Sequence, residues 1–145
     1  MSSHVDPTRD AFAAFRALPS PGSIQMLNLV RFRERAAYPE DHPQAAEGLT
    51  GAQAYRRYGR AAAPVLARVG GRQLWLAKPE MTLIGPQDER WDIAFVAEYP
   101  SVDAFAAMIH DPEYRQAVIH RQAAVEDSRL IRMQPSSSGE GFGEA

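Results

Sequence analysis

Two adjacent residues, His120 and Arg121, are the leading candidates for acid–base and anion-binding chemistry in this sequence. Both lie on a segment that begins at Asp111-Pro112 and in which apolar residues recur at helical spacing. His120 falls at the border of the core-facing stripe, and an imidazole titrates near neutrality, so it could act as a general acid or base. Arg121 would hold a fixed positive charge beside it for an anionic or carbonyl-bearing ligand. The alternative for His120 is a surface histidine bonded to a backbone carbonyl.

Further side chains could complete a small-molecule pocket around that pair. Asn28 interrupts a nearly continuous apolar strand and could orient a ligand carbonyl, unless the backbone or a dimer mate satisfies its amide. Tyr55 and Tyr58 share one face of the longest predicted helix, where their hydroxyls would be polar tips on apolar rings. A simple core role is the alternative for at least one of these tyrosines. Phe95 and Met108 would supply apolar walls.

Composition excludes several other kinds of site. The chain of 145 residues contains no cysteine, which excludes thiol catalysis, disulfides, iron–sulfur clusters and cysteine zinc sites. No HExxH, EF-hand, GxGxxG or Walker pattern occurs, so we expect no metal and no other cofactor. The formal net charge of −2 argues against nucleic acid or an anionic membrane as a partner.

The hydropathy of the sequence indicates in which cellular compartment to expect the protein. No apolar run approaches the roughly 20 residues that a membrane-spanning helix needs. The N-terminal stretch lacks the apolar core of a signal peptide. We therefore expect a cytoplasmic protein.

The strands that must position these residues are marked by two patterns. Residues 24–32 form an apolar run typical of a central strand that is covered on both faces. Residues 72–99 predict a β-hairpin closed by a turn at 85–90, because its second arm alternates strictly between two faces. Pro79 lies in the first arm and cannot donate to a ladder, so that arm should be an edge strand or carry a bulge there.

The long helix has clear start and stop signals. Thr50 and Gln53 fit a capping box, and Gly70-Gly71 ends the helix in the left-handed conformation open to glycine. Pro64 lies inside and should kink this helix or divide it in two.

Shorter helices are predicted around this core. Asp6 as N-cap and Pro7 as first helical residue would begin an N-terminal helix. Ser101 caps one short helix and Asp111 the next. Residues 128–133 are a last strand.

The predicted order is strand, helix, strand, strand, helix pair, strand. This is the ferredoxin-like βαββαβ arrangement of an α+β protein, with a four-stranded antiparallel sheet. We divide the chain into an N-terminal helical extension (1–23), a ferredoxin-like domain (24–133) and a disordered tail (134–145). The unpatterned stretch 33–49 is either a lid or a mobile connection.

The helices can cover only one face of such a sheet, yet both faces are apolar. Leu27 and Leu29 point away from Met26 and Val30, and an uncovered apolar face of several hundred Å² is a liability in a monomer. We therefore predict a homodimer through the open sheet face.

Several strings carry a resemblance to a known family. They are MLNLVRFRE (26–34), YRRYGRAAAPVLARVGGR (55–72), IGPQDERWD (84–92), FAAMIHDPEYRQA (105–117) and HRQAAVEDSRLI (120–131). Together they resemble the DUF1330 proteins of the dimeric α/β-barrel superfamily, over about residues 24–133. The resemblance implies the ferredoxin-like fold and a dimeric α/β barrel, and it implies no general activity for the family.

Relatives elsewhere in that superfamily include cofactor-free monooxygenases, muconolactone isomerases and haem-binding enzymes, and transfer from them is analogy by fold. Two hypotheses follow. The first is cofactor-free isomerase or monooxygenase-like chemistry on a small aromatic or lactone-like ligand. The alternative is a non-catalytic dimeric ligand-binding or structural module. A haem-binding variant ranks third.

Overall fold

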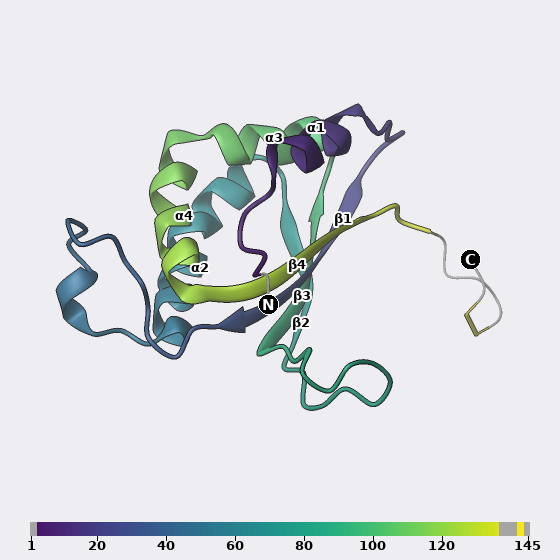
Figure 1. Cartoon of the computed structure of the whole chain (residues 1–145). Coiled ribbons are helices and arrows are strands. Elements are labelled where there is room, and N and C mark those ends of the chain that lie inside the picture. Colours follow the sequence, from purple (N-terminus) through teal and green to yellow (C-terminus); the bar gives the residue numbers. More distant parts are fainter. Residues whose placement is uncertain (1–2, 137–141, 144–145) are drawn as a thin grey trace.

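The candidate residues lie on a β-sheet and on the helices packed against it. The computed structural model describes residues 3–136 and 142–143. Within them a four-stranded antiparallel sheet, in the order β2-β3-β1-β4, carries helices on one face (Figure 1). The strands are β1 (Ile24–Phe32), β2 (Arg72–Ala77), β3 (Ile93–Tyr99) and β4 (Val125–Met133). This order confirms the predicted α+β, ferredoxin-like fold, with β1 and β3 in the centre and β2 at an edge.

The helices are α1 (Arg9–Ala17), the short 3₁₀ helix η1 (Ala45–Glu47), α2 (Gly51–Arg68), α3 (Val102–His110) and α4 (Pro112–Ala124). Of these, α2, α3 and α4 begin at the predicted caps, Thr50, Ser101 and Asp111. The capping box is confirmed: Gln53 N donates to Thr50 Oγ1 at 3.1 Å, and Thr50 N donates to Gln53 Oε1 at 2.9 Å. Pro64 does not divide α2, which is one continuous helix.

The start of α1 differs from the prediction. Thr8, and not Asp6, is the N-cap, because its hydroxyl oxygen accepts from Ala11 N at 3.0 Å. Asp6 lies instead beside α4, where Gln122 Nε2 is 3.3 Å from its carboxylate. Residues 4–6 therefore precede the helix and belong to no helix or strand, and α1 packs on the core through its phenylalanines.

Side chains along β1 and β3 alternate between the two faces of the sheet as predicted. Ile24, Met26 and Val30 are buried under the helices. Asn28 lies in the same row of side chains and Arg31 in the opposite one, where it forms an ion pair with Glu126 at 3.3 Å.

The hairpin is shorter than predicted. β2 ends at Ala77, before Pro79, and residues 78–92 form a loop that projects from the body of the molecule (Figure 1). The ladder between β2 and β3 shifts register between Gln73 and Trp75, so the bulge lies there and not at the proline. All of β2 is exposed, as an edge strand.

The segment 33–49 is tied to the ends of both long helices. Arg33 N donates to Ala124 O at 2.8 Å, Ala37 N donates to Ala123 O at 2.8 Å, and Gly51 N donates to Arg33 O at 3.1 Å. A Cβ on Gly51 would come within 2.1 Å of Arg33 O and 2.9 Å of Ala124 O. This meeting of three backbones fixes how α2 and α4 sit over the sheet.

Two glycine-to-alanine variants in α2 should therefore have opposite effects. Gly51→Ala pushes a methyl group into backbone atoms, and we expect it to lower the free energy of unfolding by about 3 kcal/mol. Gly59→Ala is the matched control, since nothing lies within 4 Å of its Cβ. It should raise the free energy of unfolding by about 0.5–1 kcal/mol through helix propensity. Urea unfolding measures both, and equal effects would contradict the close contact at Gly51.

Candidate functional site

Arg121 is a charged residue buried between the helix layer and the sheet. Its residue surface is only 9% exposed. One terminal nitrogen, Nη1, donates to the carbonyl oxygen of Val5, and the other, Nη2, lies 3.3 Å from Ser128 Oγ. In the described part of the chain its carboxylate partner is Asp6, at 3.9 Å, with a side chain that is 47% exposed. The buried guanidinium is thus solvated mainly by neutral oxygens.

A cluster of tyrosines lies near this guanidinium. Tyr58 Oη lies 2.9 Å from Tyr114 Oη, and the rings of Tyr55 and Tyr58 are 5.3 Å apart. Burial raises the pKa of Tyr55, Tyr58 and Tyr114, and the nearby Arg121 charge opposes that rise in each pKa. Since all three stay protonated near neutral pH, they are hydrogen-bond donors and not bases.

Tyr99 and Met108 close one end of this interior. The hydroxyl of Tyr99 donates to Met108 Sδ at 3.8 Å, and both side chains are buried in the apolar cluster below α3. Met108 therefore belongs to one apolar cluster and Val5, the partner of Arg121, packs on another, with Tyr58 against both.

Asn28, Phe95 and Leu130 form one row across the inner face of the sheet, because Asn28 pairs with Phe95 on β3 and with Leu130 on β4. All three are incompletely buried, whereas Met26 and Val30 on either side of the row are buried. The Asn28 amide donates to Met26 O at 3.1 Å, so its own strand satisfies one of its protons. The cover of the sheet is thinnest along this row.

His120 does not join the other predicted site residues. Its Nδ1 lies 2.6 Å from Tyr38 Oη, and the rings of His42 and His120 meet edge to face at 5.7 Å. Successive residues of an α-helix point about 100° apart, so with Arg121 directed at the sheet, His120 faces the segment 33–49. His120 and Arg121, predicted to meet one ligand, therefore point to different sides of α4.

The sequence does not identify Tyr38 and His42 as the residues that contact His120. The segment 33–49 has no periodicity, and only the helix geometry shows that it folds back onto His120. Burial, then the charges of His42 and Arg57, lower the pKa of His120 below its ordinary value.

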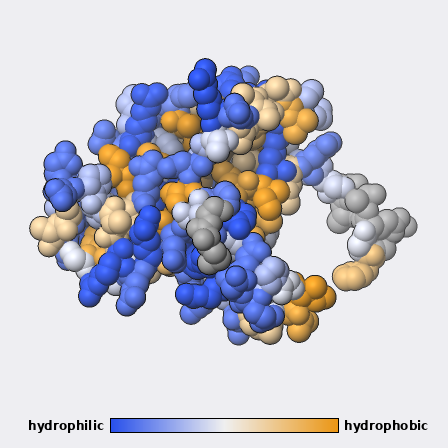
Figure 2. Space-filling model, in the orientation of Figure 1, coloured by the Kyte–Doolittle hydropathy of each residue, from blue (hydrophilic) through white to orange (hydrophobic). Residues whose placement is uncertain are grey.

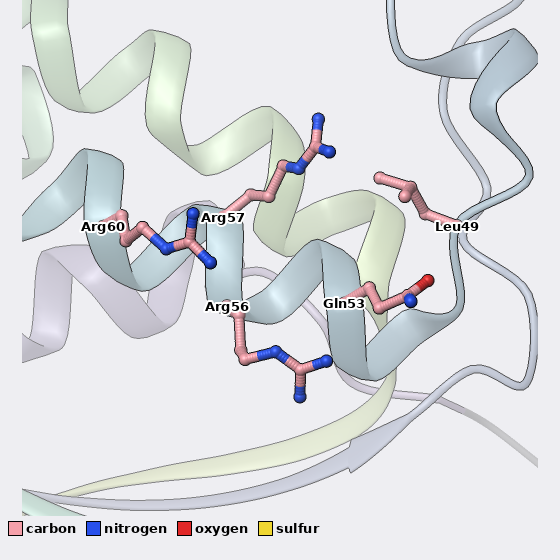
Figure 3. Close-up of a pocket in the computed structure, with 5 residues that line it drawn as sticks. All are labelled: Leu49, Gln53, Arg56, Arg57 and Arg60. Carbon is pink, nitrogen blue, oxygen red and sulfur yellow. The ribbon is translucent and has the colours of Figure 1, made fainter.

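A surface hollow of about 230 Å³ lies on the exposed side of α2 (Figure 3). Arg56 and Arg60 point toward it beside Leu49 and Gln53, and Arg57 forms an ion pair with Glu47 at 3.1 Å. This hollow contains none of the residues predicted from the sequence. Its open, exposed arginines show no built site.

Among the described residues, no group of three or more His, Asp or Glu side chains could hold a metal ion. No helix in the described ranges is both long and apolar enough to cross a membrane.

The sheet order and the single helix layer define a ferredoxin-like α+β protein with a polar cluster between its layers. The chain belongs to the DUF1330 family, a domain of unknown function, which it matches over residues 45–134. No curated protein matches it.

Solved structures are also similar to this chain. The crystal structure of methylated RPA0582 protein is 57% identical, covers 97% of this chain and 100% of its own, and has a TM-score of 0.89. A second structure, of the RPA0582 protein of unknown function from Rhodopseudomonas palustris, is also 57% identical, with coverage of 94% and 100% and a TM-score of 0.87. A dimeric protein of unknown function with a ferredoxin-like fold, from Bacteroides fragilis, is 18% identical, with coverage of 77% and 95% and a TM-score of 0.46.

The surroundings of His120 predict a pH effect on stability. A histidine whose pKa is lowered by folding binds fewer protons in the folded state, so the free energy of unfolding falls as pH drops below about 6.5. His120→Gln should lose this part of the pH dependence, measured by urea unfolding between pH 5 and pH 8. Gln116→Ala, an exposed change on the same helix, is the control and should keep the wild-type slope. An unchanged slope in His120→Gln would contradict the assigned environment.

Proposed function

We propose that this protein is a homodimer that binds a small aromatic or lactone-like molecule in each protomer, between the sheet and its helices. The observation that carries the proposal is the buried Arg121 guanidinium near a tyrosine cluster. A buried charge is costly unless it is paired, and the pairing carboxylate of Asp6 is half exposed and 3.9 Å away. Such a cation is suited to hold an oxygen of a ligand.

The proposed pocket uses the residues expected from the sequence, apart from His120. Tyr55, Tyr58 and Arg121 supply polar groups on the helix side. Asn28 and Phe95 supply the floor, along the thinly covered row of the sheet, and Met108 closes the far end. Aromatic rings on several sides favour a flat, apolar ligand with a carbonyl group.

Binding is better supported than catalysis. With His120 turned toward Tyr38, the interior contains protonated phenols and a guanidinium, which polarise or orient a carbonyl but do not remove a proton. Cofactor-free isomerase or monooxygenase-like chemistry is therefore the narrower form of the proposal. His120 would be its acid–base residue only for a ligand that reaches the Tyr38 side of α4.

A non-catalytic structural module is the second candidate. The hydrogen bonds of Asn28 to Met26 O and of Tyr58 to Tyr114 favour it, since these polar groups satisfy one another. In that case the interior binds no small molecule.

Coumarin, a fluorescent aromatic lactone, separates the two candidates. Tyr58→Phe keeps the ring and removes the hydroxyl, and we expect coumarin to bind it about fivefold more weakly than the wild type, the loss of one hydrogen bond. Tyr38→Phe, the same change beside His120, is the matched control and should bind normally. Fluorescence titration gives both constants. An effect of Tyr38→Phe alone would move the site to His120, and no binding would favour the structural module.

The dimer proposal rests on exposed apolar surface. On the open face of the sheet Trp75 is 47% exposed and Ile131 is 46% exposed. The tip of the loop 78–92 adds an apolar patch, visible in orange in Figure 2, to which Leu83 and Ile84 contribute with 81% and 93% exposure. A second copy packed on this face would cover the sheet and the loop.

Light scattering at micromolar concentration should give the mass of a dimer. Ile131→Asp places a charge on the proposed interface and should give a monomer, because an unpaired buried carboxylate is costly. Leu18→Asp changes an exposed leucine at the C-cap of α1, outside the proposed interface, and should remain dimeric. A monomeric wild-type protein would overturn the proposal.

A further inference from the structure

We propose that Arg121 and Ser128 form a carboxylate-binding subsite, and that the N-terminal segment 4–6 fills it and must move before a ligand carboxylate can bind. This inference rests on the ligand site proposed above. It adds the charge of the ligand, a further binding residue, Ser128, and a means of closing the site.

The segment 4–6 lies between α4 and β4 and is held by both. In Figure 1 the N-terminal chain starts beside β4 and runs up to α1. On the strand side, His4 N donates to Asp127 Oδ1 at 2.8 Å, and Ser128 Oγ donates to His4 O at 2.7 Å. On the helix side, Arg121 Nη1 donates to Val5 O. Two successive backbone carbonyls thus occupy the two donors of the proposed subsite.

The donors suit a carboxylate better than they suit amide oxygens. A guanidinium presents parallel N–H groups that match the two oxygens of a carboxylate, and such charge-assisted bonds are stronger than bonds to a neutral carbonyl. The Ser128 hydroxyl, which is buried, accepts from Arg121 Nη2 and has its own proton to donate. The structure already places a carboxylate nearby, since Asp6 Oδ1 is 3.9 Å from Arg121.

The charge of Arg121 favours a ligand carboxylate that replaces the carboxylate of Asp6. When the segment leaves, the Asp6 carboxylate leaves with it, and Arg121 is left as a buried cation without a counter-ion. A ligand that brings its own carboxylate restores the pairing. A neutral ligand does not, so the subsite selects for acids.

The segment is held mainly through its backbone, and its polar side chains face solvent. The side chains of His4 and Asp6 are 61% and 47% exposed, and the bonds of Gln122 to Asp6 are at the surface. Val5 is the apolar anchor, half-buried against the cluster that contains Val30 and Tyr55. The ring of an aromatic acid would take the place of the Val5 side chain there, while its carboxylate replaces the carbonyl oxygens of the segment.

The experiment uses benzoate as the acid and benzyl alcohol as the uncharged control, with calorimetry on the full chain. Val5→Gly removes the anchor and leaves both donors intact, so it should bind benzoate about tenfold more tightly than the wild type, as closure no longer competes. Ser3→Gly, the same substitution type outside the contacts, should bind like the wild type. Benzyl alcohol should bind every variant more weakly than benzoate does.

The role of Ser128 is tested in the Val5→Gly variant. In the wild type, loss of the Ser128 hydroxyl would also remove its hydrogen bond to His4 O and so release the segment. Val5→Gly/Ser128→Ala should bind benzoate about fivefold more weakly than Val5→Gly, since one hydrogen bond to the carboxylate is lost. Equal affinities of these two proteins would remove Ser128 from the subsite. Equal affinities of Val5→Gly and the wild type would show that the segment does not close the site.

A second variant keeps the test valid if Val5→Gly fails to fold. The natural chain has no cysteine, so Val5→Cys gives a single thiol whose labelling rate reports release of the segment. Benzoate should speed this labelling, and it should leave Ala13→Cys, on the exposed side of α1, unchanged. Unchanged labelling of Val5→Cys at saturating benzoate overturns the inference. Binding of coumarin without binding of benzoate refutes the subsite alone, whereas binding of neither refutes the ligand site as well.

Discussion

The guanidinium of Arg121 is the group on which the interior of this protein depends. A cation 9% exposed between a sheet and a helix layer needs oxygens around it, and the chain supplies them from Ser128, from the backbone at Val5 and from the tyrosine cluster. The same charge explains why the N-terminal segment follows the gap between α4 and β4 before α1 begins. Without that segment Arg121 loses both the Val5 carbonyl oxygen and the nearby carboxylate of Asp6.

The position of Arg121 is set by backbone geometry elsewhere. Gly51, Arg33 and Ala124 meet closely enough that a methyl group on the glycine would collide, which holds α2 and α4 in one orientation. In that orientation Arg121 faces the sheet and His120 faces Tyr38. The separation of these neighbours divides a single predicted site into an interior cluster of phenols with a cation and a surface imidazole pair.

Much of the fold could be predicted from local patterns, because each pattern has a local cause. The two-residue alternation along β3 and the Thr50 capping box act over a few residues and have the predicted outcome. The role of residues 4–6 and the contact of Tyr38 with His120 could not be predicted, since they join parts of the chain more than 80 residues apart without periodicity. Asp6 shows the difficulty, because a residue typical of a helix N-cap pairs here with Arg121 instead.

A crystal structure of the protein grown with saturating benzoate tests the central claim most directly. We expect the carboxylate within hydrogen-bond distance of Arg121 and Ser128, the ring against Tyr55 and Phe95, and residues 4–6 displaced from β4. A structure with benzoate bound elsewhere, and with the carbonyls of His4 and Val5 still on Ser128 and Arg121, would contradict it.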